Sequence, residues 1–225
     1  MSYENLQSPR FEKNERKDWG VALNVSKECE QEAFRIRDAI LDRGVTLVAR
    51  LEQHPHITLF QGELSSDSRK AIECVVEELR DQFFQDHPEE LVIQMEDNLH
   101  FRTSNNNIFW NVQSSEWLTA LHISLDERLR ALPEWNMMKQ FRDRIQKGGL
   151  TPAEVDHIKK YGVLSAGALF LPHVTVGKLA NGADFERIKD VSVSAVSFHV
   201  RQVIAGAVDR YGQIENVEIT NEMRK

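Results

Sequence analysis

The pattern of apolar and polar positions along the chain predicts a mixture of strands and helices. Residues 20–26 have the apolar character of a short strand, whereas 28–43 place Ala33, Ile36 and Ile40 on one face of a helix. The two types of element do not alternate strictly, which indicates an α+β fold. Further helices are predicted from about 66, from about 115 and near 183–189, and further strands at 46–51, 56–60, 91–96, 99–103, 107–113, 168–179, 192–200 and 202–209. The last two strands are expected to pair as a hairpin.

The segment 133–162 is predicted to be a helical insertion. Residues 151–154 (TPAE) form a capping box with proline at the first helical position, so the insertion should carry short helices of its own. The six prolines and eleven glycines of the chain are scattered, and no stretch has the composition of a linker. We therefore expect a single domain over 1–225, with two similar lobes at roughly 18–113 and 114–220.

Length and charge narrow the classes of partner. A chain of 225 residues with 41% apolar content can bury a real core. Its formal charge of -7 argues against capture of duplex DNA, which needs a broadly basic surface, but a local pocket could still bind a nucleotide or a short RNA end. No apolar run is long enough for a membrane span, and the charged ends, 1–17 and 220–225, are expected to be frayed. We expect a cytoplasmic monomer that does not bind a membrane.

Cysteine and histidine spacing gives no sign of a metal centre. Cys29 and Cys74 lie in separate predicted helices, which is not the arrangement of a disulfide framework or a paired-cysteine metal site. His54 and His56 flank a proline, but no third ligand lies at a suitable spacing. The sequence therefore predicts no metal and no cofactor.

A pattern of histidine, apolar residue, threonine and apolar residue occurs twice, as HITL from His56 and as HVTV from His173. In an extended strand, alternate side chains point to opposite faces. Each copy therefore presents an imidazole and a hydroxyl, from Thr58 or Thr175, on one face and anchors the other face with apolar residues. A proline precedes the histidine in both copies.

These paired motifs resemble those of the 2H phosphoesterase superfamily, which includes bacterial 2'-5' RNA ligase-like proteins and cyclic nucleotide phosphodiesterases. Gly62 and the pair Gly177 and Lys178 also suit the pattern, and the resemblance extends from about Trp19 to about Val208. It implies two lobes related by a pseudo-twofold axis. Each lobe would be an antiparallel sheet backed by helices, with a central cleft between the two.

The resemblance implies a phosphodiesterase that hydrolyses a cyclic or short-oligonucleotide phosphodiester, such as a 2',3'-cyclic phosphate, without metal. His56 and His173 would act as general base and acid, because in-line attack on phosphorus needs a proton acceptor and a proton donor on opposite sides. An unperturbed pKa near 6.5 lets one ring be neutral and the other cationic. Thr58 and Thr175 would bind the phosphate oxygens. Which histidine is the base stays open.

Other side chains could contact the substrate. Aromatic rings can stack on a nucleobase and cations can pair with phosphate, although each such residue also fits an ordinary place in the core or on the surface. The aromatic candidates are Phe60 and Phe170, which flank the motifs, with Trp110 and Tyr161 in segments that could approach the cleft. The candidate phosphate or leaving-group contacts are Lys178 and Arg102.

Three alternatives stay open at this point. Reversal of the same chemistry would give an RNA end-joining or 2'-5' linkage processing enzyme. A non-catalytic module could bind a nucleotide phosphate, although it would have no need of two proton-transfer groups. A metal-dependent hydrolase would use the histidines at 54 and 56. The insertion at 133–162 could act as a lid or a specificity element.

Overall fold

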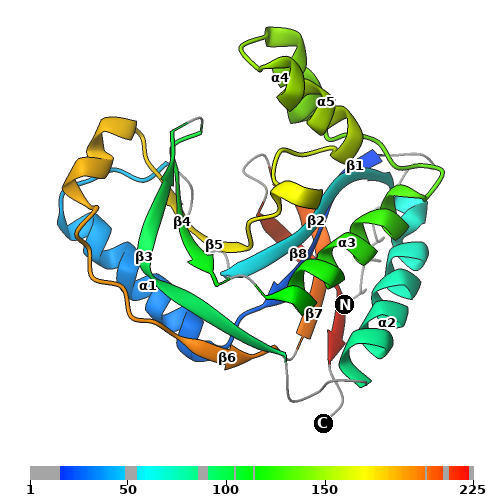
Figure 1. Ribbon diagram of the computed structural model, residues 1–225, viewed down its shortest axis with the longest axis horizontal. Helices are drawn as coiled ribbons and strands as arrows, with labels where there is room; N and C mark the ends of the chain where they lie inside the picture. Colours follow the sequence, from blue (N-terminus) through cyan, green and yellow to red (C-terminus); the bar gives the residue numbers. More distant parts are fainter. Residues whose placement is uncertain are drawn as a thin grey trace, which may run out of the picture.

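A computed structural model describes residues 16–48, 55–85, 91–103, 105–113, 115–200, 202–209 and 213–222. Within these residues, eight strands form one antiparallel sheet with helices packed against it (Figure 1), which confirms the α+β class. The strands are β1 (Arg16–Asn24), β2 (His56–Ser65), β3 (Val92–Arg102), β4 (Asn107–Val112), β5 (His173–Lys178), β6 (Ser197–His199), β7 (Gln202–Val208) and β8 (Ile214–Glu222).

The two motif strands meet at the centre of the sheet. The strand order is β6-β3-β4-β5-β2-β1-β7-β8, so four strands lie on each side of the junction between β5 and β2, and the whole sheet is curled (Figure 1). Each half draws strands from both sides of residue 113, since β6 joins β3 whereas β7 and β8 join β1. The midline of the sheet therefore does not coincide with the expected lobe boundary, and the division into 18–113 and 114–220 stays a prediction.

The expected hairpin of 192–200 with 202–209 is wrong. Strand β6 pairs with β3, with Phe198 opposite Ile93, whereas β7 lies between β1 and β8. The alternation of apolar residues identifies a strand but does not identify its partner. Pairing with β3 lets the Phe198 side chain join the hydrophobic core, which favours that partner. Strand β8 was not expected, because exposed positions such as Val217 and Thr220 give it little apolar periodicity.

Five α-helices occur in the described part of the chain, and local signals fix where several of them begin. The Ser26 hydroxyl caps α1 by accepting from the Cys29 backbone N–H, and Ala33, Ile36 and Ile40 are buried as the periodicity predicts. The helices are α1 (Lys27–Asp42), α2 (Arg69–Gln85), α3 (Glu116–Arg130), α4 (Lys139–Lys147) and α5 (Pro152–Tyr161), with short 3-10 helices η1 (Ser66–Ser68), η2 (Gly167–Leu169) and η3 (Gly182–Arg187).

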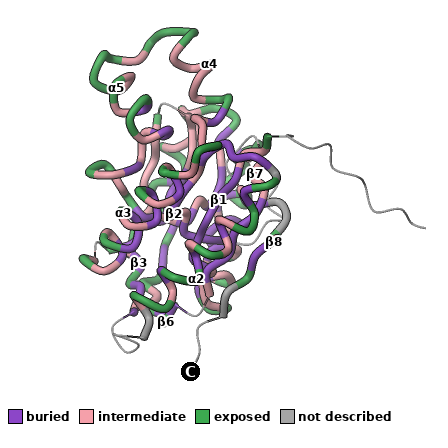
Figure 2. The backbone as a smooth tube through the Cα atoms, turned by 90° about the vertical axis from the view of Figure 1, so that its right-hand side faces the viewer, coloured by how far each residue is buried: buried purple, intermediate pink, exposed green. Residues whose placement is uncertain are grey.

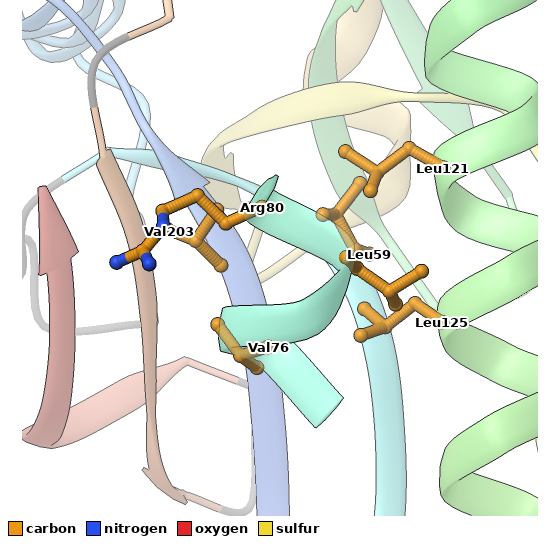
Figure 3. Close-up of a pocket in the computed structure, with 7 residues that line it drawn as sticks. Leu59, Val76, Arg80, Leu121, Leu125 and Val203 are labelled. Atoms are coloured by element: carbon orange, nitrogen blue, oxygen red, sulfur yellow. The ribbon is translucent and has the colours of Figure 1, made fainter. Parts of the chain in front are cut away.

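Helices α2 and α3 pack against the sheet through aliphatic side chains. Leu59 of β2, Leu121 and Leu125 of α3, Val76 of α2 and Val203 of β7 surround a small cavity in this layer (Figure 3). Leu79 and Arg80 of α2 complete the lining, so the cavity is a mostly apolar gap in packing between the helices and the sheet. The two helices therefore pack against the sheet beside β2 and β7.

The predicted insertion forms the hairpin of α4 and α5, which projects from the rim of the sheet (Figures 1 and 2). Its capping box is confirmed: the Thr151 hydroxyl accepts from the Glu154 N–H at 3.2 Å, and the Glu154 carboxylate accepts from the Thr151 N–H at 2.8 Å. None of the helices in the described ranges combines the length and apolar character that crossing a membrane requires.

The centre of the core is predicted to tolerate truncation poorly. Ile57 of β2 has no exposed surface, whereas Ile123 on α3 is 40% exposed. We expect Ile57→Ala to lower the free energy of unfolding by about 2–5 kcal/mol, because a cavity remains where the side chain was. Ile123→Ala, the matched control, should change it by less than about 0.5 kcal/mol. Urea unfolding measures both, and equal losses would contradict the packing described.

Candidate active site

A single residue pair aligns the two motifs. Strands β2 and β5 are antiparallel, and Ile57 lies opposite Val174. Since register runs in opposite directions along antiparallel strands, each motif histidine lies opposite the threonine of the other copy. Ile57 and Val174 are both fully buried, so the histidines and threonines on either side of them share the other face of the sheet.

The four motif side chains differ in exposure. His56 is buried, with 6% of its surface exposed, whereas His173 and the two threonines are half-buried. The site is therefore a partly closed surface in which hydroxyl and imidazole groups remain accessible to a small ligand.

Hydrogen bonding fixes the tautomer of His173. Its Nδ1 lies 2.7 Å from the carbonyl oxygen of Leu171, which can only accept a hydrogen bond. Nδ1 therefore carries the proton, and the lone pair of the neutral ring is on Nε2. A ring in this state can accept a proton.

Burial lowers the pKa of His173 to about 4, because the imidazolium loses solvation; the hydrogen bond to Leu171 opposes this shift. The positive charges of Arg102 and His56 lower the pKa further. His173 is therefore neutral at pH 7. The repulsion between the two motif rings also disfavours the state in which both are protonated.

On the β5 side of the site, the His173 ring, the Phe109 ring and the Arg102 guanidinium lie one against the next. The Phe109 ring lies 4.0 Å from the His173 ring between centroids, tilted by 47°, and the Arg102 guanidinium carbon lies 4.9 Å from the Phe109 centroid. Burial and the charge of Arg144 lower the pKa of Arg102. The stack places a cation close to the motif, whereas contact of Arg102 with a phosphate stays a prediction.

A pocket opens next to the motif, where β2 and the segment 163–171 lie on either side of α3. Its enclosed part is small, about 30 Å³, and most of the roughly 360 Å³ around it is open to solvent. Four of the residues singled out in the sequence line it: Thr58, Phe60, Phe170 and His173. His56 and Thr175 are not among its lining residues, but they lie beside it on the same face of the sheet.

The other two predicted contacts do not line this pocket. Tyr161 packs against Gly167 and lies under the Arg130 guanidinium, 4.9 Å from ring centroid to guanidinium carbon. Lys178, at the far end of β5, lies opposite Asn107. Contact of either side chain with a substrate stays a prediction.

His122 and Asp126 complete the wall of the pocket and were not predicted to do so. The His122 Nδ1–H donates to the Leu59 carbonyl at 2.7 Å, its Nε2 accepts from the Gly167 N–H at 2.9 Å, and its ring stacks on Phe170 at 3.8 Å. A signal was present in the sequence, because both polar residues lie on the apolar stripe of α3. His122 clamps β2, α3 and the segment before β5 together.

The arrangement of the possible metal ligands is relevant to the prediction that no metal binds. Within the described ranges, no group of three His, Cys, Asp or Glu side chains is arranged to hold a metal ion. His54 lies outside the described residues. The absence of a metal and a cofactor therefore stays a prediction.

Comparison with known proteins identifies the fold. No protein-family model and no curated protein matches the chain. E. coli LigT complexed with ATP matches with a TM-score of 0.55 and 14% identity, covering 94% of this chain and 100% of LigT. Apo LigT gives 0.53 and 14%, covering 94% and 99%. TT0787 of Thermus thermophilus gives 0.50 and 12%, covering 92% and 98%. The chain shares the fold of these proteins.

The buried His122 predicts acid sensitivity. Burial lowers its pKa to about 4 in the folded state, below the value near 6.5 expected on unfolding. The unfolded chain then binds more protons, so stability is lost as pH falls from about 6.5 to about 4, by up to about 3 kcal/mol. We expect His122→Asn to reduce the slope of this part of the curve in urea unfolding, while His173, whose pKa is lowered in the same way, keeps part of it.

His199→Asn is the control, because His199 is exposed. It should keep the wild-type fall in stability between these pH values. A His122→Asn curve as steep as that of the wild type would show that the ring is not held neutral.

Proposed function

We propose that the chain is a 2H phosphoesterase that hydrolyses a cyclic or short-oligonucleotide phosphodiester, such as a 2',3'-cyclic phosphate, without metal. The observation that carries the proposal is the pair of histidine-threonine motifs on one face of the sheet, aligned by Ile57 and Val174. The fold shared with LigT agrees with the resemblance of the motifs. LigT has been solved with ATP and with 3'-AMP, which supports a nucleotide as substrate here.

In this proposal His173 is the general base. It is neutral, and its Nε2 carries a lone pair. As the oxygen of a water molecule bonds to phosphorus, Nε2 takes the proton of that water. His56, protonated at the start, donates its proton to the ribose oxygen as the bond from that oxygen to phosphorus breaks. Product release leaves His173 protonated and His56 neutral, and proton exchange with solvent resets both.

The threonines and Arg102 stabilise charge in the same scheme. Thr58 and Thr175 would donate hydroxyl hydrogen bonds to the nonbridging oxygens, where negative charge grows in the transition state. The bound phosphate would also lessen the repulsion between the two imidazoles. Arg102, stacked on Phe109 beside His173, would attract the anion to the site.

The pocket next to the motif suits the remainder of a nucleotide. Phe60 and Phe170 line it, although Phe60 is only 3% exposed and one face of Phe170 is covered by His122. We therefore assign them to shaping the pocket around a ribose or base rather than to broad stacking. We also propose that the protein is a cytoplasmic monomer that does not bind duplex DNA. Tyr161 and Lys178 are proposed as further contacts with the substrate.

Substrate turnover tests the proposal. The substrates are 2',3'-cyclic mononucleotides, 2'-5' oligoadenylates and RNA with a 2',3'-cyclic end. We expect His56→Ala and His173→Ala each to lower kcat on the best substrate by roughly 10²–10⁴, the weight of a general acid or base. Loss in the double variant should be smaller than the product of the single losses, because the two groups act as a unit.

His199→Ala, an exposed histidine far along the chain, should keep wild-type turnover. Wild-type kcat in either motif variant would rule out the two-histidine mechanism. Binding of a cyclic nucleotide without turnover would identify a binding module, and joining of the cyclic end to a 5'-hydroxyl RNA would identify the end-joining alternative.

The pH dependence tests the assignment of roles. We expect kcat/KM, which reports the free enzyme, to be bell-shaped, with its acidic limb below pH 6.5 because burial lowers the pKa of His173. The two apparent values belong to the pair of histidines. Exhaustive chelation should leave the curve unchanged, whereas a single limb with turnover lost in EDTA would indicate a metal-bound hydroxide.

Threonine variants serve as controls for this profile. Thr58→Val and Thr175→Val should lower kcat by about 10–10³, the range for loss of one oxyanion donor, while both limbs stay in place. A displaced limb would show that the hydroxyls set the pKa values of the histidines and do more than bind phosphate.

A further inference from the structure

Helix α4 is a basic element on an acidic chain. Its nine residues, KQFRDRIQK, include four basic side chains and one acidic one, whereas the whole chain has a formal charge of -7. None of its residues is buried, and the hairpin that it forms with α5 stands out from the rim of the sheet (Figures 1 and 2). Core packing therefore does not explain this composition.

The base of the hairpin is fixed to β2, the strand that carries His56 and Thr58. Glu63 and Asn136 exchange two backbone hydrogen bonds of 2.9 and 2.8 Å, and Arg142 of α4 pairs with the Glu63 carboxylate at 2.6 Å. The Trp135 ring fills the space over Gly62, where a Cβ would lie 2.7 Å from its Nε1. These contacts hold α4 at a set position relative to the motif.

Arg144 and Lys147 lie on the side of α4 away from this anchor. Residues three apart share a helix face, whereas Arg142 and Arg144, two apart, point in different directions. Among the described residues, no carboxylate forms an ion pair with Arg144 or Lys147. Glu154 senses the charge of Arg144, but its carboxylate accepts hydrogen bonds from Thr151. Two like charges on one face repel unless an anion binds there.

The basic face of α4 influences Arg102, the cation next to the motif. The charge of Arg144 reaches Arg102, whose pKa it lowers, and Arg102 is part of the stack on Phe109 and His173. The charges of Arg102 and Arg144 therefore act in one region beside the motif, and Lys147 lies on the same face of α4 one turn further along. A strand whose end lies at the motif would carry further phosphates toward these cations.

We propose that α4 binds the phosphate backbone of a single RNA strand whose terminal phosphodiester lies at the histidine-threonine site. The inference rests on the proposed function and makes it more specific: the substrate class is an oligonucleotide end, and a mononucleotide lacks the phosphates that α4 would bind. RNA fits better than an acidic protein, because the charged face is continuous with a phosphate site and a strand carries one charge per nucleotide.

Binding provides the direct test. The probe is a fluorescently labelled hexanucleotide RNA with a noncyclic 3'-phosphate, whose Kd is measured by anisotropy at several salt concentrations. R144E/K147E should raise Kd by about tenfold or more and should reduce the salt dependence, by about 0.7 in the slope of log Kd against log salt for each phosphate that the protein no longer neutralises. K27E/K70E, with two exposed lysines of α1 and α2, changes net charge equally and should retain tight binding.

Turnover provides a second readout. For the wild type and both double variants, KM is measured for a 2',3'-cyclic mononucleotide and for the hexanucleotide with a 2',3'-cyclic end. R144E/K147E should raise the ratio of the oligonucleotide KM to the mononucleotide KM by about tenfold, and K27E/K70E should not. If the wild type turns over neither substrate but binding depends on α4, the proposed phosphodiesterase is wrong and the strand-binding surface stands.

Other results would overturn the proposal. R144E/K147E and K27E/K70E could bind the RNA equally well, which would make the charge of α4 irrelevant to nucleic acid. Polyglutamate could displace the RNA at equal charge concentration, which would identify α4 as a surface for an acidic protein. Circular dichroism of the double variants confirms that α4 and the sheet remain folded in each comparison.

Discussion

The site depends on one pairing between two strands. Ile57 and Val174 lie opposite each other at the only registered position between β2 and β5 in the described ranges, and both are fully buried. A slip of one residue would move every side chain of either strand to the other face of the sheet. Burial of these two residues therefore sets which side chains lie on the motif face of the sheet. Neither half of the sheet carries both histidines, so the halves must pair before the site exists.

Burial also divides the chemistry between two identical side chains. His173 is kept neutral by lost solvation and by nearby positive charge, although its hydrogen bond to Leu171 opposes that effect. The positive charge of a protonated His56 would lower the pKa of His173 further, so protonation of both rings at once is disfavoured. The same loss of solvation lowers the pKa of His122, whose two ring nitrogens are both engaged by backbone groups, so that this ring acts as a structural clamp that is sensitive to acid. Position relative to the motif face separates the two outcomes.

Local signals in the sequence were sufficient for some elements and insufficient for others. The apolar stripe of α1 and the capping box at Thr151 depend on residues a few positions apart, and both were predicted correctly. The partners of β6 and β7 depend on distant segments, which alternation cannot reveal, and the predicted hairpin failed for that reason. The motif residues were visible because they recur, whereas His122 and Asp126 acquire their place only when α3 packs beside β2.

The insertion is attached to the motif strand without altering this central pairing, so the proposed RNA-binding surface would be an addition to the site. Strand β2 continues beyond Thr58 to Ser65, and its extension supplies Glu63, which holds both Asn136 and Arg142. Because a strand is stiff over such a length, the charged face of α4 is placed relative to the motif by the same backbone that positions the motif itself. If α4 binds an RNA strand as proposed, sequence changes in α4 would alter which strands bind while the histidines and threonines keep their geometry.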